Sequence, residues 1–234
     1  MSRATGKVNG RWSSYIEGVL FDYTQPERLR LIGTDGRRLH ATFTRTLMHS
    51  ADEIARLVRT EWIEAFKRLN LPADTDVFLE FRCENILAWR IPSAGIHGVA
   101  KCIDTPYPDY DKVIPESCES RFRVDLAATL ESLDALTPVA TQQDGRDMVI
   151  VNANSVLTLS AESESMGSAK AEVSCEHIAG PESNFALNII YFGETLKLAD
   201  GEILMSNSSK LEPAVFEFPG TERVAVVMPV RLPE

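Results

Sequence analysis

The chain has 234 residues, of which 44% are hydrophobic and 25% are charged, and its formal net charge is −10. This length suits one large or two small domains with ordinary cores, and the composition is that of a soluble globular protein. No apolar run approaches the roughly 20 residues that span a bilayer, and the first residues lack the apolar core of a signal peptide, so we expect a cytoplasmic protein. The negative charge disfavours a tight, sequence-reading DNA-binding protein.

The first half of the chain predicts strands on either side of one helix. Asp35-Gly36 is typical of a tight hairpin turn, because glycine readily adopts the positive φ that such turns need. Ser50 with Glu53 three residues later matches a capping box and predicts a helix over 51–69, which has one apolar face. The predicted strands are 15–23, 28–33, 37–44, 75–82, 84–91 and 95–103.

The second half predicts a repeated unit. Asp125 is the expected N-cap of a helix that runs to about 136, and Asn188 is the expected N-cap of a helix that runs to about 198. The predicted strands are 121–124, 147–152, 155–161, 168–175, 184–187, 201–206, 214–218 and 223–228. This order is β-α-β-β-β written twice. The first half shows the same unit once, after three strands of another, so the chain predicts an α+β fold with domains over 1–115 and 116–234.

Four stretches carry a resemblance to a known family. They are 15–21 (YIEGVLF), 34–39 (TDGRRL), 107–115 (YPDYDKVIP) and 226–232 (VVMPVRL). In this order they resemble the middle and C-terminal domains of the bacterial DNA sliding clamp, the β subunit of the replicative DNA polymerase. The resemblance implies the DNA-clamp fold with two clamp domains. The family's N-terminal domain has no counterpart here, and the middle domain lacks its first strand and helix, so the first domain is expected to be truncated.

The resemblance implies a sliding-clamp-like processivity factor for DNA replication, not an enzyme. In the family these stretches meet at a hydrophobic cleft that tethers DNA polymerase, the clamp loader and repair proteins through short linear peptides. An apolar, partly pre-formed pocket with a few polar groups suits that task. By position, the cleft residues here are Ile16, Thr34, Gly36, Arg37, Arg38, Leu39, Pro108, Lys112, Val113, Val226, Met228, Pro229, Val230, Arg231 and Leu232.

The family's helices present basic residues to double-stranded DNA. On the helix predicted after Ser50, the candidates are Arg56, Arg59 and Lys67, which we expect to bind DNA weakly and without sequence preference. The same face reads equally well as an ordinary solvated surface, because glutamates balance its charge. Two-domain chains could close a ring as a homo-oligomer, with a trimer favoured over a dimer, unless the truncated edge prevents closure.

Catalytic and metal-binding patterns are missing from the sequence. The four cysteines form no C-x-x-C pair, and the four histidines form neither H-x-x-x-H nor H-E-x-x-H. Asp104, Asp109 and Asp111 form an acidic patch that could hold Mg²⁺ only weakly. We therefore assign no catalytic residue, no metal and no cofactor. Three functions stay open: a working clamp, a clamp mimic that binds the same peptides without encircling DNA, and an α+β enzyme with an unrecognised site.

Overall fold

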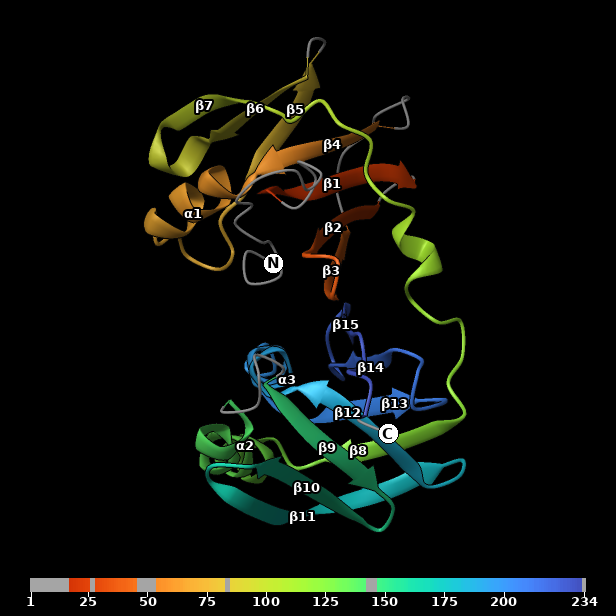
Figure 1. Cartoon of the computed structure of the whole chain (residues 1–234). Helices are drawn as coiled ribbons and strands as arrows, with labels where there is room; N and C mark the ends of the chain where they lie inside the picture. The colour runs from red at the N-terminus through yellow and green to blue at the C-terminus, as the bar shows by residue number, and fades with distance from the viewer. Residues whose placement is uncertain (1–16, 26–27, 46–53, 83–84, 142–146, 233–234) are drawn as a thin grey trace. The chain divides into compact units, whose positions relative to one another are not determined.

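The computed structural model describes residues 17–25, 28–45, 54–82, 85–141 and 147–232. The chain divides into two units, 1–108 (unit 1) and 109–234 (unit 2), each with its own core (Figure 1). The sequence predicted a division seven residues later, and both positions lie in the connector that joins the units, residues 104–119. Across the described part of the chain, no helix is long and apolar enough to cross a membrane.

Unit 2 contains the β-α-β-β-β unit twice, as the sequence predicted. The first copy is β8 (Ser120–Val124), α2 (Leu126–Ala140), β9 (Met148–Ala153), β10 (Val156–Ser163) and β11 (Gly167–Ala179). The second copy is β12 (Ser183–Asn188), α3 (Ile189–Leu196), β13 (Ile203–Asn207), β14 (Ala214–Glu217) and β15 (Arg223–Val227). Within the unit the strands follow the order β12-β9-β10-β11-β8-β13-β14-β15. The two copies interlock, because β8 pairs with β13 and β12 pairs with β9.

Both helices of unit 2 begin at the predicted caps. The Asp125 carboxylate accepts a hydrogen bond from the Ala128 N–H at 2.8 Å, and the Asn188 side chain accepts one from the Tyr191 N–H at 3.0 Å. Each bond satisfies a backbone donor that a helix start leaves without an intrahelical partner. Figure 1 shows α2 and α3 beside each other on the sheet. Their buried side chains, with those of the strands, form the core of unit 2.

Unit 1 repeats this plan only in part. It consists of β1 (Gly18–Gln25), β2 (Arg28–Thr34), β3 (Arg38–Arg45), β4 (Ile54–Arg59), α1 (Thr60–Arg68), β5 (Phe78–Arg82), β6 (Ile86–Ile91) and β7 (Ile96–Lys101). Within the unit the strands form two sheets, β3-β2-β1-β4 and β5-β6-β7. The pairing of β1 with β4 corresponds to that of β9 with β12. No described residue of unit 1 takes the place of β8 or α2, as expected for a truncated domain.

The helix predicted over 51–69 is wrong in its first part. Ile54–Arg59 is strand β4, and the helix begins only at Thr60; Ser50 and Glu53, the predicted capping box, lie outside the described residues. β4 pairs along the whole of Gly18–Tyr23 in β1, where Leu57 and Val58 become buried. The apolar spacing suited a helix, but sheet pairing and β-branched Val58 favour a strand once β1 is available as a partner.

A buried ion pair joins β1 to β2. Asp22 and Arg30 are direct cross-strand partners, and their side chains, 5% and 10% exposed, approach to 3.0 Å. Arg30 also donates to the Thr24 hydroxyl at 3.2 Å, and Asp22 accepts from the Thr24 N–H at 2.9 Å. The charges are therefore desolvated together and held by further hydrogen bonds, the condition under which a buried ion pair is tolerated.

Candidate functional site

The predicted hairpin turn of unit 1 is tightly ordered by its own side chains. Gly36 has φ of 82°, the left-handed conformation expected of the turn glycine. The Thr34 hydroxyl donates to the Arg38 carbonyl at 2.7 Å and accepts from the Gly36 N–H at 3.1 Å. The Asp35 carboxylate accepts from the Arg37 and Arg38 N–H groups at 3.0 Å each. The turn is thus a rigid element, with Gly36 and Arg37 exposed at its tip.

The Arg38 side chain is held within the turn by Asp35. Its Nε lies 3.0 Å from the Asp35 carboxylate, and the two side chains are only 8% and 13% exposed. Leu39, the next cleft candidate, is 2% exposed. Within unit 1 these two residues hold the turn in place, and the exposed cation at its tip is Arg37.

The connector lies against unit 1 at one end and begins unit 2 at the other. The Tyr107 hydroxyl donates to the Ile32 carbonyl of β2 at 3.3 Å, which fixes the chain just before Pro108. Lys112 pairs with Asp109 at 2.9 Å, and this hydrogen bond lowers the pKa of Asp109 and raises that of Lys112. Lys112 is highly exposed, so this pair is screened by water and contributes little stability.

The C-terminal segment leaves the core of unit 2 abruptly. Val226 is fully buried in β15, whereas Met228, two residues on, is 39% exposed. The Val230 N–H donates to the Ala186 carbonyl of β12 at 2.8 Å, so the segment is tied to the sheet rather than hanging free. Four residues from Pro229 onward are half-buried or exposed: Pro229, Val230, Arg231 and Leu232. The segment therefore offers a fixed, partly apolar surface.

The predicted cleft residues thus fall into separate parts of the two units. Thr34 to Leu39 and Pro108 belong to unit 1, where the Tyr107 bond brings connector and β2 together. Lys112, Val113 and the residues from Val226 to Leu232 belong to unit 2. Ile16 lies outside the described residues.

The predicted DNA-binding residues do not share one helix. Arg56 and Arg59 lie on β4, and only Lys67 lies on α1. Arg59 is 3.6 Å from Glu17 and Lys67 is 3.0 Å from Glu64, so acidic neighbours offset two of the three cations. Weak attraction to phosphate is the most that this arrangement supports.

Charge is distributed unevenly along the chain. Residues 1–108 contain 15 Lys and Arg against 13 Asp and Glu, whereas residues 109–234 contain 9 against 21. Within their bounds α2 and α3 contain no Lys or Arg, while α2 carries Glu131 and Asp134 and α3 carries Glu194. The helices of unit 2 therefore present acidic groups to any approaching polyanion.

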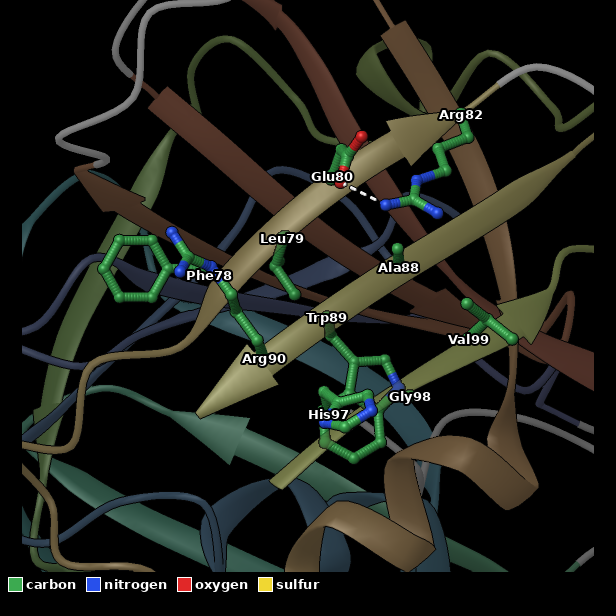
Figure 2. Close-up of a pocket in the computed structure, with 10 residues that line it drawn as sticks. All are labelled: Phe78, Leu79, Glu80, Arg82, Ala88, Trp89, Arg90, His97, Gly98 and Val99. Atoms are coloured by element: carbon green, nitrogen blue, oxygen red, sulfur yellow. Dashed lines mark hydrogen bonds and ion pairs between the residues drawn. The ribbon is translucent and has the colours of Figure 1, made fainter. Parts of the chain in front are cut away.

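One hollow in unit 1 was not anticipated from the sequence. It has a volume of about 540 Å³ and lies on the three-stranded sheet (Figure 2). Phe78 stands opposite Arg90, whose guanidinium is 4.4 Å from the ring centroid, and Glu80 pairs with Arg82 at 2.8 Å. The alternation of β5 could have placed Phe78, Glu80 and Arg82 on one face. The charged groups of this face already pair with one another or with the ring, so the hollow suits contact with a protein surface better than chemistry.

Metal and thiol chemistry find no support among the described residues. They contain no group of three or more His, Cys, Asp or Glu side chains placed to hold a metal ion. Burial raises the pKa of the three described cysteines, Cys102, Cys118 and Cys175, which favours the protonated thiol over the nucleophilic thiolate. Cys83 lies outside the described residues.

The interlocked β-α-β-β-β units define the class of fold, that of a DNA sliding clamp. The crystal structure of the DNA polymerase sliding clamp from Pseudomonas aeruginosa superposes with a TM-score of 0.89 at 21% identity, and the match covers 99% of this chain and 62% of that one. No family model matches the sequence.

Curated relatives point to the bacterial member of that class. The beta sliding clamp of Synechococcus elongatus is 25% identical over 215 residues, which cover 89% of this chain and 56% of the relative. The beta sliding clamp of Pseudomonas aeruginosa is 25% identical over 223 residues, which cover 93% and 58%. This chain therefore resembles bacterial beta sliding clamps along nearly its whole length and spans just over half of theirs.

Proposed function

We propose that the chain is a sliding-clamp-like processivity factor that holds DNA polymerase, the clamp loader and repair proteins through a peptide-binding cleft. The likeness to beta sliding clamps supports this function, and we place it in the cytoplasm. The observation that carries the proposal is the C-terminal segment, which leaves a buried strand at Val227 and exposes Met228 on a backbone tied to Ala186. An exposed methionine on a fixed backbone can repack around different apolar anchors.

The cleft that we propose combines this segment with the rigid turn of unit 1. The partner peptides would place leucine and phenylalanine side chains on Met228, Pro229 and Val230. Arg37 would supply a cation for an acidic or carbonyl group of the peptide. The turn and the segment are each held by hydrogen bonds within their own unit, so neither has to be ordered locally when a peptide binds.

A fluorescent peptide titration tests this assignment. A short peptide with a glutamine and spaced leucine and phenylalanine anchors should bind the full chain in the micromolar range, about −8 kcal/mol. Met228→Ala should weaken binding about tenfold, because it removes the apolar contact. Met166→Ala is the matched control, since Met166 is 58% exposed but lies at the β10–β11 turn. Arg37→Ala examines the contribution of unit 1.

The peptide affinities of the three variants distinguish a cleft built from both units from a site in one unit. Loss of affinity in the Met228 and Arg37 variants, with none in the Met166 variant, supports a cleft built from both units. No binding by the unaltered chain, or equal loss in the Met166 variant, would contradict the cleft. Loss in the Met228 variant alone would restrict peptide binding to unit 2.

The second candidate is a clamp mimic that binds such peptides without encircling DNA. The acidic helices of unit 2 favour it, because a ring lined by α2 and α3 would repel phosphates. We expect weak, non-specific binding to double-stranded DNA, carried by Arg56, Arg59 and Lys67. Fluorescence anisotropy at two salt concentrations should show affinity falling steeply with salt.

A charge-reversal pair identifies the DNA-contacting unit. Arg56→Glu with Arg59→Glu should abolish the remaining DNA binding. Arg121→Glu with Arg123→Glu on β8 is the matched control in unit 2 and should leave it unchanged. A sequence-specific footprint, or binding that persists in high salt, would refute this account.

Assembly decides between the two candidates. A ring of two-domain chains requires a homo-oligomer, and six domains make a trimer. Sedimentation at several concentrations should show a trimer for a working clamp. A monomer at tens of micromolar would exclude an autonomous ring and leave the mimic.

A further inference from the structure

Unit 1 contains an apolar groove that no described residue covers. It has a volume of about 240 Å³ and is lined only by apolar side chains, among them Leu29 and Leu31 of β2 and Trp62, Ile63 and Phe66 of α1. None of these α1 side chains is fully buried, and α1 as a whole buries no residue. An amphipathic helix normally buries its apolar face against a neighbour. Here part of that face is left open.

Unit 2 shows which kind of segment fills the equivalent space. β1, β2, β3 and β4 of unit 1 correspond in order and pairing to β9, β10, β11 and β12 of unit 2. α1 then corresponds to α3. In unit 2, α2 packs on β10 and β11 and lies beside α3. A helix in the same position of unit 1 would lie over β2 and beside α1, which is the location of the groove.

Among the described residues of unit 1, the outer edge of β5 has no strand in the position that β8 occupies beside β13. β13 pairs with β14 on one side and with β8 on the other. β5, its counterpart, ends its sheet and pairs only with β6 among the described residues of the unit. Every residue of β5 is half-buried or exposed, whereas four of the five residues of β13 are buried. Exposed Val77 and Phe78 begin this free edge. An unpaired edge strand is a template for another strand.

We propose that the β5 edge and the apolar groove together bind a strand–helix segment of another polypeptide. Its strand would pair antiparallel with β5, as β8 does with β13. Its helix would place an apolar face of leucine-sized side chains on Ile63 and Phe66. This combines two established modes of recognition, strand addition and a helix in a groove.

The described residues cannot supply this segment themselves. Each strand–helix pair of the chain is already engaged, β4–α1 in unit 1 and both β8–α2 and β12–α3 in unit 2. No described strand–helix pair is therefore free to occupy the β5 edge and the groove.

A fusion protein tests whether the groove accepts such a segment. Residues 1–17 are replaced by a copy of residues 119–147, so that the copied helix leads into β1 as α2 leads into β9. The replacement also removes Trp12 and leaves Trp62 and Trp89 as the only tryptophans. The control fusion carries Leu133→Asp and Leu136→Asp in the copied helix, which remove its buried apolar face.

The fusion should shift the tryptophan emission to the blue and slow amide exchange in β5 about tenfold relative to the control fusion. Ile63→Asp in the groove should abolish both effects in the fusion, and the same substitution in the unaltered chain measures the stability lost because Ile63 also packs against the core of unit 1. If fusion and control fusion behave alike, or if Ile63→Asp lowers the stability of the fusion and of the unaltered chain by the same amount, the proposal is wrong.

The unaltered chain distinguishes the source of the segment. With no partner present, its β5 amides should exchange rapidly at every protein concentration. Protection of β5 that rises with concentration would identify a second copy as the occupant and overturn the proposal. Protection that is lost when residues 1–14 are deleted would identify the chain's own N-terminal residues and overturn it as well.

Discussion

The helices of the two units differ in what they bury, although each has one apolar face. α2 and α3 each bury four residues fully, and α1 buries none. α2 and α3 pack against each other over a continuous sheet, whereas α1 has no second helix beside it among the described residues. The contrast shows that an apolar face on a helix does not by itself ensure burial. How much of the face is buried depends on which other elements of the domain pack against it.

Truncation of one phenylalanine in each unit should give the largest contrast. Phe192 of α3 is fully buried and its ring centroid lies 5.5 Å from that of Phe216, so Phe192→Ala should cost about 3–5 kcal/mol. Phe66 of α1 lies 4.6 Å from Trp89 but is half-buried, so Phe66→Ala should cost roughly half as much. Guanidinium unfolding followed by circular dichroism measures both. Equal losses would mean that α1 is covered in solution.

Glycine substitutions should have opposite signs in the two units. A Cβ at Gly98 would lie 2.7 Å from the Trp89 ring, which also contacts Trp62 and Phe66, so Gly98→Ala should destabilise unit 1 by about 1–3 kcal/mol. A Cβ at Gly193 meets nothing within 4 Å, so Gly193→Ala in α3 should stabilise unit 2 by about 0.5–1 kcal/mol. Thermal unfolding of both variants checks the signs. A stable Gly98→Ala variant would show that Trp89 can move away.

Helix caps offer a smaller test of the same contrast. Asp125→Ala removes the cap of α2 and should cost about 1 kcal/mol. α1 has no side-chain cap at Arg59, so Arg59→Ser should stabilise unit 1 by about 0.5–1 kcal/mol. Arg68→Ser, in the last turn of α1, is the control for the lost charge. Urea unfolding provides the measurement, and a gain in the control of equal size would refute the cap explanation.

The cysteines should produce the smallest effect, confined to alkaline pH. Burial raises the pKa of Cys102 above its ordinary value of 9.0, so the folded chain holds this thiol proton more tightly than the unfolded chain does. The resulting stability is complete below the unfolded pKa and is lost as the pH rises above it. Urea midpoints at pH 8 and pH 10 should therefore diverge more in the unaltered chain than in Cys102→Ala. Equal divergence would assign the loss to other groups.

The second half of the chain was predictable because its signals are local. Asp125 and Asn188 cap their helices by bonds to residues three positions along the chain. The strand predicted over 223–228 is also present, and it ends one residue earlier, at Val227. In the first half, the turn at Gly36 was predictable for the same reason, because the positive φ is a property of that one residue.

The failures come from contacts that the sequence does not encode locally. Residues 54–59 have helical spacing, yet they form β4 because β1 lies free to pair with them. The hollow beside Phe78 depends on three strands meeting in register, and the groove lies where no described residue of unit 1 covers α1 and β2. Such features follow from tertiary structure and cannot be obtained from one stretch of residues.

The buried pair of Asp22 and Arg30 has a consequence for how unit 1 selects its strand alignment. Strand side chains alternate between faces, so sliding β2 by one residue along β1 would move Asp22 and Arg30 to opposite faces. A carboxylate and a guanidinium would then each be buried without the other, which is far costlier than the loss of an apolar contact. The pair thus favours one alignment of β1 with β2 over the others. Replacing both residues with neutral ones of similar volume should leave unit 1 folded but allow β2 to pair with β1 in more than one register.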